Sequence, residues 1–259
     1  RILILNNGLK HGFQNWGKDH APEVDIASAN KITIIKGAAG VRFGPEALGG
    51  AIIVEPNPLY LKEKFYGEVR SGFQTNGKGY NSGFEVGQGK KKWSYFLNGN
   101  YTKLGDRNSP DYMLTNSGKQ ELSFGTGVRY RTKNLDIKTY YSLVDQNLGL
   151  LRASFFHSAN AIRQAFVAEQ PDSTYVSPFS YAINEPNQLT QHHLAKGEVK
   201  WTYSDHGNLI LRAGKQLNKR KEFDVRRNSS KPIIDLDLIT NDVQLEWNHP
   251  DKFGLDGMI

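Results

Sequence analysis

The sequence contains no cysteine and no long hydrophobic run in its 259 residues. Without cysteine, the chain can form no disulfide, bind no metal through thiolates and use no cysteine nucleophile. No apolar run approaches the roughly 18 residues that a membrane-spanning helix needs. A disulfide-stapled protein and a helical membrane protein are therefore excluded, but a transmembrane β-barrel, whose segments are only about 10 residues of alternating polarity, stays open.

Acidic residues are outnumbered by basic ones, 26 to 33, which gives a formal net charge of +7. A basic chain permits an anionic partner such as nucleic acid or lipopolysaccharide. The basic residues are dispersed, however, and the short clusters at residues 90–92 and 226–227 have the character of turns or loops. We therefore expect no nucleic-acid partner.

Catalytic and metal-binding constellations are also missing from the sequence. No set of His, Asp and Ser and no pair of carboxylates gathers in one segment, so we expect neither an enzyme nor a cofactor. His20 and the adjacent residues His192 and His193 suggest a metal site, but neighbours on a strand point to opposite faces. No carboxylate at ligand spacing accompanies them, and we expect no metal site.

Apolar and polar residues alternate from Phe65 onward, which predicts long β-strands. In residues 92–103, one face carries Trp93, Tyr95, Leu97, Gly99 and Tyr101, and the other carries Ser94, Phe96, Asn98, Asn100 and Thr102. Aromatic residues lie near the ends of the apolar faces. We expect eight strands, at residues 65–75, 79–89, 92–104, 119–132, 134–145, 191–204, 208–219 and 237–248.

The expected connections alternate between tight turns at one end of the sheet and long loops at the other, the longest at residues 146–190. Outer-membrane barrels have this asymmetry together with alternating faces and aromatic girdles. A soluble β-sandwich also alternates, but its strands average about 5 to 6 residues, whereas those expected here are ~10 to 14 residues long. The strand lengths therefore favour the barrel.

The first 58 residues differ from the rest and predict a small α+β unit. Three short apolar strands are expected, in the stretches RILIL, KITIIKG and GAIIV, with a loop-like stretch between the first two. The chain opens inside a strand, with no initiator methionine or signal sequence. We therefore expect it to be part of a longer protein.

The glycine-rich segment KGAAGVRFGPEALGG, residues 36–50, raises the question of a phosphate site. A P-loop needs a lysine directly after its second glycine, and a dinucleotide fingerprint needs the pattern G-x-G-x-x-G. Neither pattern is present. We interpret the segment as a strand, a turn, a loop and a second strand, with glycines placed for tight turns and close packing.

This segment resembles the C-terminal part of the plug domain in TonB-dependent outer-membrane receptors. The family pattern is a strand ending in Ile-Lys-Gly, small residues, an aromatic-Gly pair, a small-residue loop, Gly-Gly and a closing strand. The matching residues are Ile35, Lys36, Gly37, Phe43, Gly44, Gly49 and Gly50, and Asn7-Gly8 stands where the family usually has Asp-Gly. Later stretches also resemble the Bacteroidetes branch of these receptors, in overall sequence character and not through a defined motif.

The resemblance implies a mainly β fold, in which about eight N-terminal strands of a larger transmembrane antiparallel β-barrel accompany part of an α+β plug. Residues 1–58 would be the plug part and residues 59–259 the barrel part. A small barrel of eight strands is the alternative, but its lumen would be too narrow for the plug. Inward-facing charges are expected to pair with one another or with the plug; they are Lys196, Glu198, Lys200, Asp242 and Glu246.

The resemblance also implies an active importer in the outer membrane of a Gram-negative bacterium. Its cargo would be a scarce nutrient such as a ferric siderophore, haem or cobalamin, and its partners would be the TonB complex, through a segment not present here, and membrane lipid and lipopolysaccharide. The alternatives are the same fold importing glycan or peptide with a surface lipoprotein, a passive porin, and a soluble β-sandwich binding module.

Candidate ligand contacts follow from this topology, since the loops after Gly8 and around Phe43 are expected at the outward apex of the plug. The long loop 146–190 is the next candidate surface. The residues expected to bind ligand are Phe13, Gln14, Asn15, Trp16, Lys18, His20, Phe43, Arg152, Phe155 and Phe156. Three alternatives stay open, because Phe43 could pack the plug against the barrel wall, Trp16 could be buried beneath a loop, and the long loop could simply close the barrel mouth.

Overall fold

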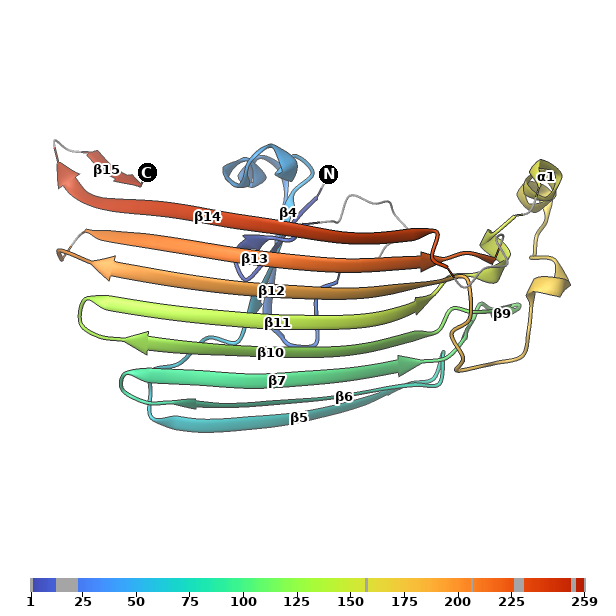
Figure 1. Cartoon of the computed structure of the whole chain (residues 1–259), viewed down its shortest axis with the longest axis horizontal. Helices are drawn as coiled ribbons and strands as arrows, with labels where there is room; N and C mark the ends of the chain where they lie inside the picture. Colours follow the sequence, from blue (N-terminus) through green and yellow to red (C-terminus); the bar gives the residue numbers. More distant parts are fainter. Residues whose placement is uncertain are drawn as a thin grey trace.

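The computed structural model of the chain describes residues 2–12, 23–156, 158–205, 207–225, 231–252 and 255–258. It consists of a large curved sheet and a small sheet whose strands cross the direction of the large one (Figure 1). Among the described residues, no helix is long and apolar enough to cross a membrane. The two sheets make the architecture mainly β, as expected from the alternating pattern.

The large sheet is antiparallel throughout and follows chain order from β5 to β15, apart from β8 and β9, which pair separately. Its strands are β5 (Lys64–Gln74), β6 (Gly79–Gly89), β7 (Trp93–Leu104), β10 (Lys119–Arg131), β11 (Leu135–Gly149), β12 (Asn187–Thr202), β13 (Asn208–Phe223), β14 (Ile234–Lys252) and β15 (Leu255–Met258). The sheet is not closed. The eight expected strands are confirmed, and the short β15 was not expected.

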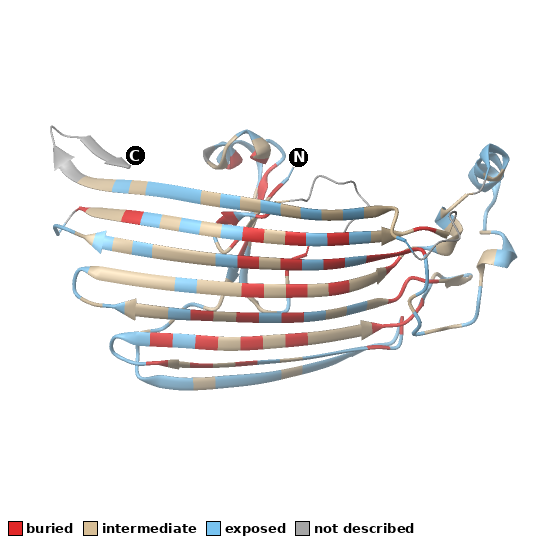
Figure 2. Cartoon of the chain, viewed as in Figure 1, coloured by how far each residue is buried: buried red, intermediate tan, exposed pale blue. Residues whose placement is uncertain are grey.

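Burial alternates along the strands of the large sheet (Figure 2). The buried side chains are mostly polar and many of the exposed ones are large and apolar, which is the reverse of a soluble protein. Polar side chains of the inner face are almost fully buried, among them Ser94, Asn98, Ser123, Gln188 and Asn218. Large apolar side chains of the other face are exposed, among them Phe65, Val69, Trp93, Leu122, Val243 and Trp247. Strand alternation thus places the apolar surface outside and the polar surface inside.

Aromatic rings gather on the outer face beside the tight turns. Trp93 of β7 and Tyr130 of β10 lie with ring centroids 4.4 Å apart. Trp201 lies 5.9 Å from Tyr203, whose hydroxyl accepts a hydrogen bond from the indole N–H of Trp247 at 2.8 Å. Such a row is the pattern of an aromatic girdle at a membrane interface.

The small sheet is mixed and has the strand order β2-β1-β4-β3. Its strands are β1 (Leu3–Asn6), β2 (Leu9–Lys10), β3 (Ala29–Ile35) and β4 (Ala51–Pro56), and the 3-10 helices η1 (Gly37–Phe43) and η2 (Pro45–Ala47) connect β3 to β4. Its core is small; it consists of Leu3, Ala47 and Ala51, with Leu5, Ile35 and Phe43 packed against them.

Glycines set two turns of the small sheet. Asn7 and Gly8 have φ values of 49° and 78°, as the two-residue turn between β1 and β2 requires. Gly50 has a φ of 113°, and a Cβ there would lie 2.5 Å from the carbonyl oxygen of Ile35. The glycine segment therefore serves close chain packing, as the sequence predicted.

The long loop at the far end of the sheet, residues 150–186, is partly structured. It contains η3 (Arg152–Ser154), α1 (Ala159–Val167) and η4 (Ser173–Tyr175). The hydroxyl of Ser158 caps α1 by accepting the amide of Ala161 at 3.1 Å. A neighbouring loop carries a minimal hairpin of β8 (Arg107–Asn108) and β9 (Met113–Leu114). The loop is shorter than expected because β11 and β12 pair beyond the predicted ends.

Candidate functional site

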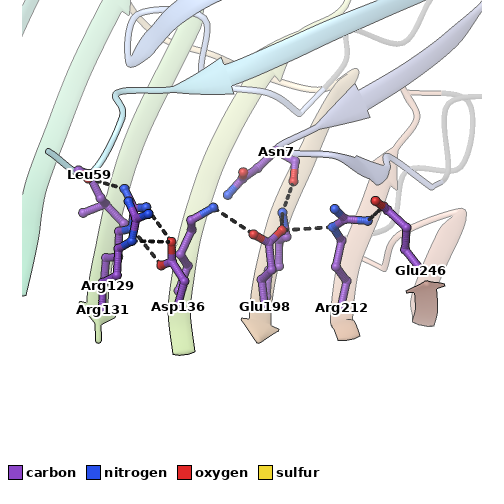
Figure 3. A network of polar contacts seen from close by, with 10 residues as sticks. Asn7, Leu59, Arg129, Arg131, Asp136, Glu198, Arg212 and Glu246 are labelled. Carbon is purple, nitrogen blue, oxygen red and sulfur yellow. Dashed lines mark hydrogen bonds and ion pairs between the residues drawn. The ribbon is translucent and has the colours of Figure 1, made fainter. Parts of the chain in front are cut away.

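A row of alternating charges crosses the inner face of the large sheet near its tight turns (Figure 3). Arg129 of β10 forms two hydrogen bonds with the Asp136 carboxylate of β11, at 2.8 and 2.5 Å. Antiparallel pairing places side chains of adjacent strands side by side, so an alternating sign along the row stabilises each neighbour.

The row continues over the next three strands through Glu198 of β12. Its carboxylate accepts Lys138 Nζ at 2.8 Å and Arg212 Nε at 2.9 Å, and Arg212 Nη1 reaches Glu246 of β14 at 2.8 Å. Lys196 Nζ lies 3.7 Å from Glu198. The expected pairing is confirmed for Lys196, Glu198 and Glu246. Lys200 and Asp242 form no ion pair with the described residues, and Asp242 Oδ1 is buried without a hydrogen bond there.

The charged row also attaches the large sheet to the small one. Lys196 Nζ donates to the carbonyl oxygen of Asn7 at 2.7 Å, and Arg129 Nη1 donates to that of Leu59 at 3.0 Å (Figure 3). Asn57 Nδ2 donates to the carboxylate of Glu85 on β6 at 2.6 Å. These contacts are polar and hydrogen-bonded. Apolar packing accompanies them, because the fully buried side chain of Leu9 lies over Gly214 of β13.

A cavity of about 940 Å³ lies between the two sheets. Its lining is chiefly charged and polar on the side of the large sheet, with Arg129, Lys138 and Glu246, and apolar on the side of the small one, with Leu5 and Phe43. Glu198, Lys196 and Arg212 line it as well. The cavity thus has one charged side and one apolar side, and its lining residues include no nucleophile and base arranged for covalent chemistry.

A second attachment point is the Asp25 carboxylate, which lies before β3. One of its oxygens, Oδ2, accepts Asn100 Nδ2 of β7 at 2.7 Å and the Ser123 hydroxyl of β10 at 2.5 Å. The other, Oδ1, accepts the amide of Ala27 at 2.9 Å. One carboxylate thus joins the small region (residues 2–12 and 23–56) to two adjacent strands of the wall (the large sheet).

A third attachment point is a buried cluster that sequence reasoning missed. Arg220 of β13 donates to Glu23, whose second oxygen lies 3.5 Å from His11 Nε2, and the His11 ring lies 4.5 Å from that of His192. Burial opposes ionisation of Glu23, but the neighbouring His11 ring and the Arg220 guanidinium outweigh it and lower the pKa of its carboxyl below the ordinary value.

The same cluster contains candidate metal ligands. In the described part of the chain, His11, Glu23 and His192 are the group whose ligand atoms lie close enough to hold an ion. His192 and His193 do point to opposite faces, since His192 is buried inside while His193 contacts the Tyr141 hydroxyl at 2.8 Å. The expected absence of a metal site considered His20 and this pair of neighbours, but not His11 or Glu23.

Six of the predicted ligand-binding residues lie outside the described residues: Phe13, Gln14, Asn15, Trp16, Lys18 and His20. Phe43 is half-buried, packs against the core of the small sheet and lines the cavity beside Arg129 and Glu246, close to the tight turns. This position differs from the outward apex that the resemblance implied. Phe43 packs within the small sheet, and its contact with a ligand stays a prediction.

The other predicted contacts lie in the long loop. Arg152 belongs to η3, and Phe155 and Phe156 follow it; all three are half-buried. Farther along, Phe179 and Tyr181 pack edge to face at 4.9 Å. Tyr181 Oη donates to the carbonyl oxygen of Lys78 at 2.7 Å, so this part of the loop folds back onto the β5–β6 turn.

The chain matches no protein-family model, and its sequence matches no curated protein. Its fold matches solved outer-membrane receptors. Siderophore receptor PirA from Pseudomonas aeruginosa has a TM-score of 0.64 at 11% identity, over 99% of this chain and 38% of the receptor. A mutant of the ferric enterobactin receptor PfeA from the same organism has a TM-score of 0.66 at 14% identity, over 99% and 40%. The alcaligin receptor FauA from Bordetella pertussis has a TM-score of 0.65 at 11% identity, over 98% and 36%.

The chain is thus similar in structure to TonB-dependent outer-membrane receptors of Gram-negative bacteria over nearly its whole length, at low sequence identity. It spans 36% to 40% of the length of the three receptors. Its large sheet matches part of a receptor barrel. These relatives are receptors and transporters, not enzymes.

Proposed function

We propose that the chain is part of a TonB-dependent importer of the outer membrane. In this proposal, residues 1–58 belong to a plug and residues 59–259 to the wall of a barrel that further strands complete. The chain would work with the TonB complex and lie among outer-membrane lipid and lipopolysaccharide. The observation that carries the proposal is the inverted burial of the large sheet.

The inverted burial suits a membrane wall because lipid favours apolar side chains and a solvated lumen favours polar ones. Soluble sandwiches bury the apolar face, so the exposed side chains of Val69 and Val243 argue against that alternative. A passive porin is disfavoured because the small region fills space beside the inner face. It is attached there by separable polar contacts, which suit a plug that must be rearranged during import.

For the cargo, we propose a ferric siderophore or a similar chelate, in a receptor of the Bacteroidetes type. Similarity in fold to siderophore receptors supports this class of cargo. The residues proposed to contact it are those of segment 13–20 that the resemblance implied, together with Arg152, Phe155 and Phe156. Phe43 is proposed mainly as a packing residue.

The test is uptake by cells that lack the gene for the full-length protein. Deletion is expected to abolish the energised uptake of one radiolabelled ferric siderophore, haem or cobalamin, and the intact gene should restore it. Dissipating the proton gradient with an uncoupler should abolish the restored uptake, since import through TonB needs energy from the inner membrane. Unchanged growth and uptake on every iron, cobalamin and glycan source would contradict the proposal.

Variants of the long loop locate the ligand surface. Arg152→Ala is expected to reduce binding of the imported compound to cells, whereas Asp172→Ala, an exposed position in the same loop, should leave it unchanged. Equal binding by both variants would remove Arg152 from the proposed surface. Heat-modifiable migration in gels serves as the check that each variant still forms a barrel in the outer membrane.

A further inference from the structure

The buried cluster of His11, Glu23 and His192 brings three ligand-type side chains together from distant parts of the chain. Their candidate ligand atoms all lie within 4.8 Å of one another, and His11 Nε2 lies 3.5 Å from Glu23 Oε2. The three residues are 3%, 1% and 1% exposed. Tetrahedral zinc holds nitrogen and oxygen ligands at about 2.0 to 2.2 Å, which places them about 3.4 Å from one another. His11 Nε2 and Glu23 Oε2 already have this spacing, and the most distant pair must approach by about 1 Å when an ion binds.

The histidines have polar atoms that the described residues leave without hydrogen bonds. Both ring nitrogens of His11 and the Nε2 atom of His192 are buried and form no hydrogen bond of ordinary geometry with the described residues, although Glu23 faces His11 at 3.5 Å and Gln216 lies near His192. Buried polar atoms without well-formed hydrogen bonds are uncommon in folded proteins, and an ion or water is an ordinary reason for them. These poorly satisfied ring nitrogens are a second observation that points to a ligand.

Neighbouring side chains orient the three residues as the outer contacts of a metal site do. Arg220 donates to Glu23 Oε1 and leaves Oε2 directed toward His11. The Asn218 side chain contacts His192 Nδ1 at 3.2 Å, and with its amide oxygen toward the ring it would accept the Nδ1 proton. This tautomer places the lone pair of His192 on Nε2, where a metal ion could bind.

We propose that His11, Glu23 and His192 bind a divalent transition-metal ion, with zinc as the best match. Two imidazoles and one carboxylate suit zinc, whereas magnesium and calcium prefer oxygen ligands alone. Water would complete the tetrahedron. Arg220 already neutralises Glu23, so we expect weaker binding than at a closed structural zinc site with four protein ligands.

The ion would join the small region to the wall at a particular place. His11 and Glu23 flank segment 13–22, and His192 belongs to β12 of the wall. A bound ion would therefore hold His11 and Glu23 against β12. The role is structural and does not rest on the proposed function, because a protein that imports nothing could hold the same ion.

The test is metal binding by the full-length protein, purified in detergent and stripped with a chelator. Titration with zinc, followed by calorimetry, is expected to give one site per chain, and elemental analysis of the reloaded protein should give one zinc ion. His11→Ala and His192→Ala should each weaken binding by roughly tenfold or more. Cobalt loaded in place of zinc should give the intense visible absorption of a four-coordinate site, absent from both variants.

His193→Ala is the matched control, because this residue is the neighbour of His192 on the opposite face of β12. It should bind zinc as the unchanged protein does. Substoichiometric zinc in the unchanged protein would overturn the proposal even if a variant failed to fold. Equal loss of binding in His193→Ala, or unchanged binding in both His11→Ala and His192→Ala, would also overturn it.

Discussion

The Ser123 hydroxyl on the wall donates a hydrogen bond of 2.5 Å to the Asp25 carboxylate of the small region. Asn100 Nδ2 donates to the same carboxylate oxygen at 2.7 Å. Ser123 and Asn100 are both buried. The three residues therefore make a polar contact in which one acceptor serves two buried donors from adjacent strands.

Removal of the acceptor should cost more than removal of one donor. Asp25→Ala leaves two buried donors unpaired and is expected to lower the free energy of unfolding by about 2 to 4 kcal/mol, whereas Ser123→Ala should cost only about 1 kcal/mol. Thermal unfolding in detergent measures the difference, with Asp172→Ala as the exposed control. A larger loss for Ser123→Ala than for Asp25→Ala would contradict the contact.

The Glu198 carboxylate holds together the charged row of the inner face. Glu198→Gln removes the negative charge that faces Lys138, Arg212 and Lys196, and leaves three cations near one another. Because the row is partly buried, we expect a loss of about 3 kcal/mol in the free energy of unfolding.

The control for Glu198 is Glu68→Gln on β5, where the side chain is exposed and lies 3.6 Å from Arg70. An exposed pair of this kind contributes about 0 to 1 kcal/mol. Combining Glu198→Gln with Lys138→Gln should recover part of the lost stability, since it removes one unpaired cation. Strictly additive losses in the double variant would mean that the two side chains are not coupled.

Asn116, which lies between β9 and β10, is hydrogen-bonded to both ends of the long loop. Its Nδ2 atom lies at 2.9, 3.0 and 2.7 Å from the carbonyl oxygens of Leu150, Asn184 and Pro186, and its Oδ1 atom accepts the amide of Asn184 at 2.9 Å. Its φ is 63°, a conformation that glycine adopts readily. Asn116→Gly therefore removes the side-chain bonds without adding backbone strain.

We expect Asn116→Gly to loosen residues 150–186 by about 2 kcal/mol, which corresponds to a roughly thirtyfold increase in local opening. Limited proteolysis of intact cells measures the cleavage rate in this loop. Asn108→Gly, at an exposed asparagine of the β8 hairpin, should leave the rate unchanged. Cleavage at equal rates in the two variants would show that Asn116 does not hold the loop.

Sequence periodicity predicted the wall well, but not the ends of its strands. β5, β6 and β7 begin and end within a residue of the prediction, whereas β11 continues to Gly149 and β12 begins at Asn187. At these ends, residues such as Asn147 and Gln191 make the outer and inner faces equally polar. Alternation disappears there while backbone pairing continues in register, so periodicity alone places the strand ends too early.

The attachment points between small sheet and wall could be predicted only in part. Glu198 and Lys196 were recognised as inward charges because the period of two fixes their face. His11, Glu23 and His192 carry no shared local pattern, and only the tertiary fold brings them together. Phe43 was expected at an outward apex, but its position in the fold depends on how the small sheet crosses the large one.

Substitution on the outer face of β14 tests whether lipid covers it. Val243 is 73% exposed, and its neighbour Gln244 lines the cavity on the inner face. Val243→Arg would place a charge in hydrocarbon and is expected to destabilise the protein folded in lipid bilayers by about 2 to 4 kcal/mol. Gln244→Arg places the same charge in a polar lumen and should cost much less. Unfolding of the full-length protein from phospholipid vesicles measures both, and a larger loss for Gln244→Arg would mean that water, not lipid, covers the face that carries Val243.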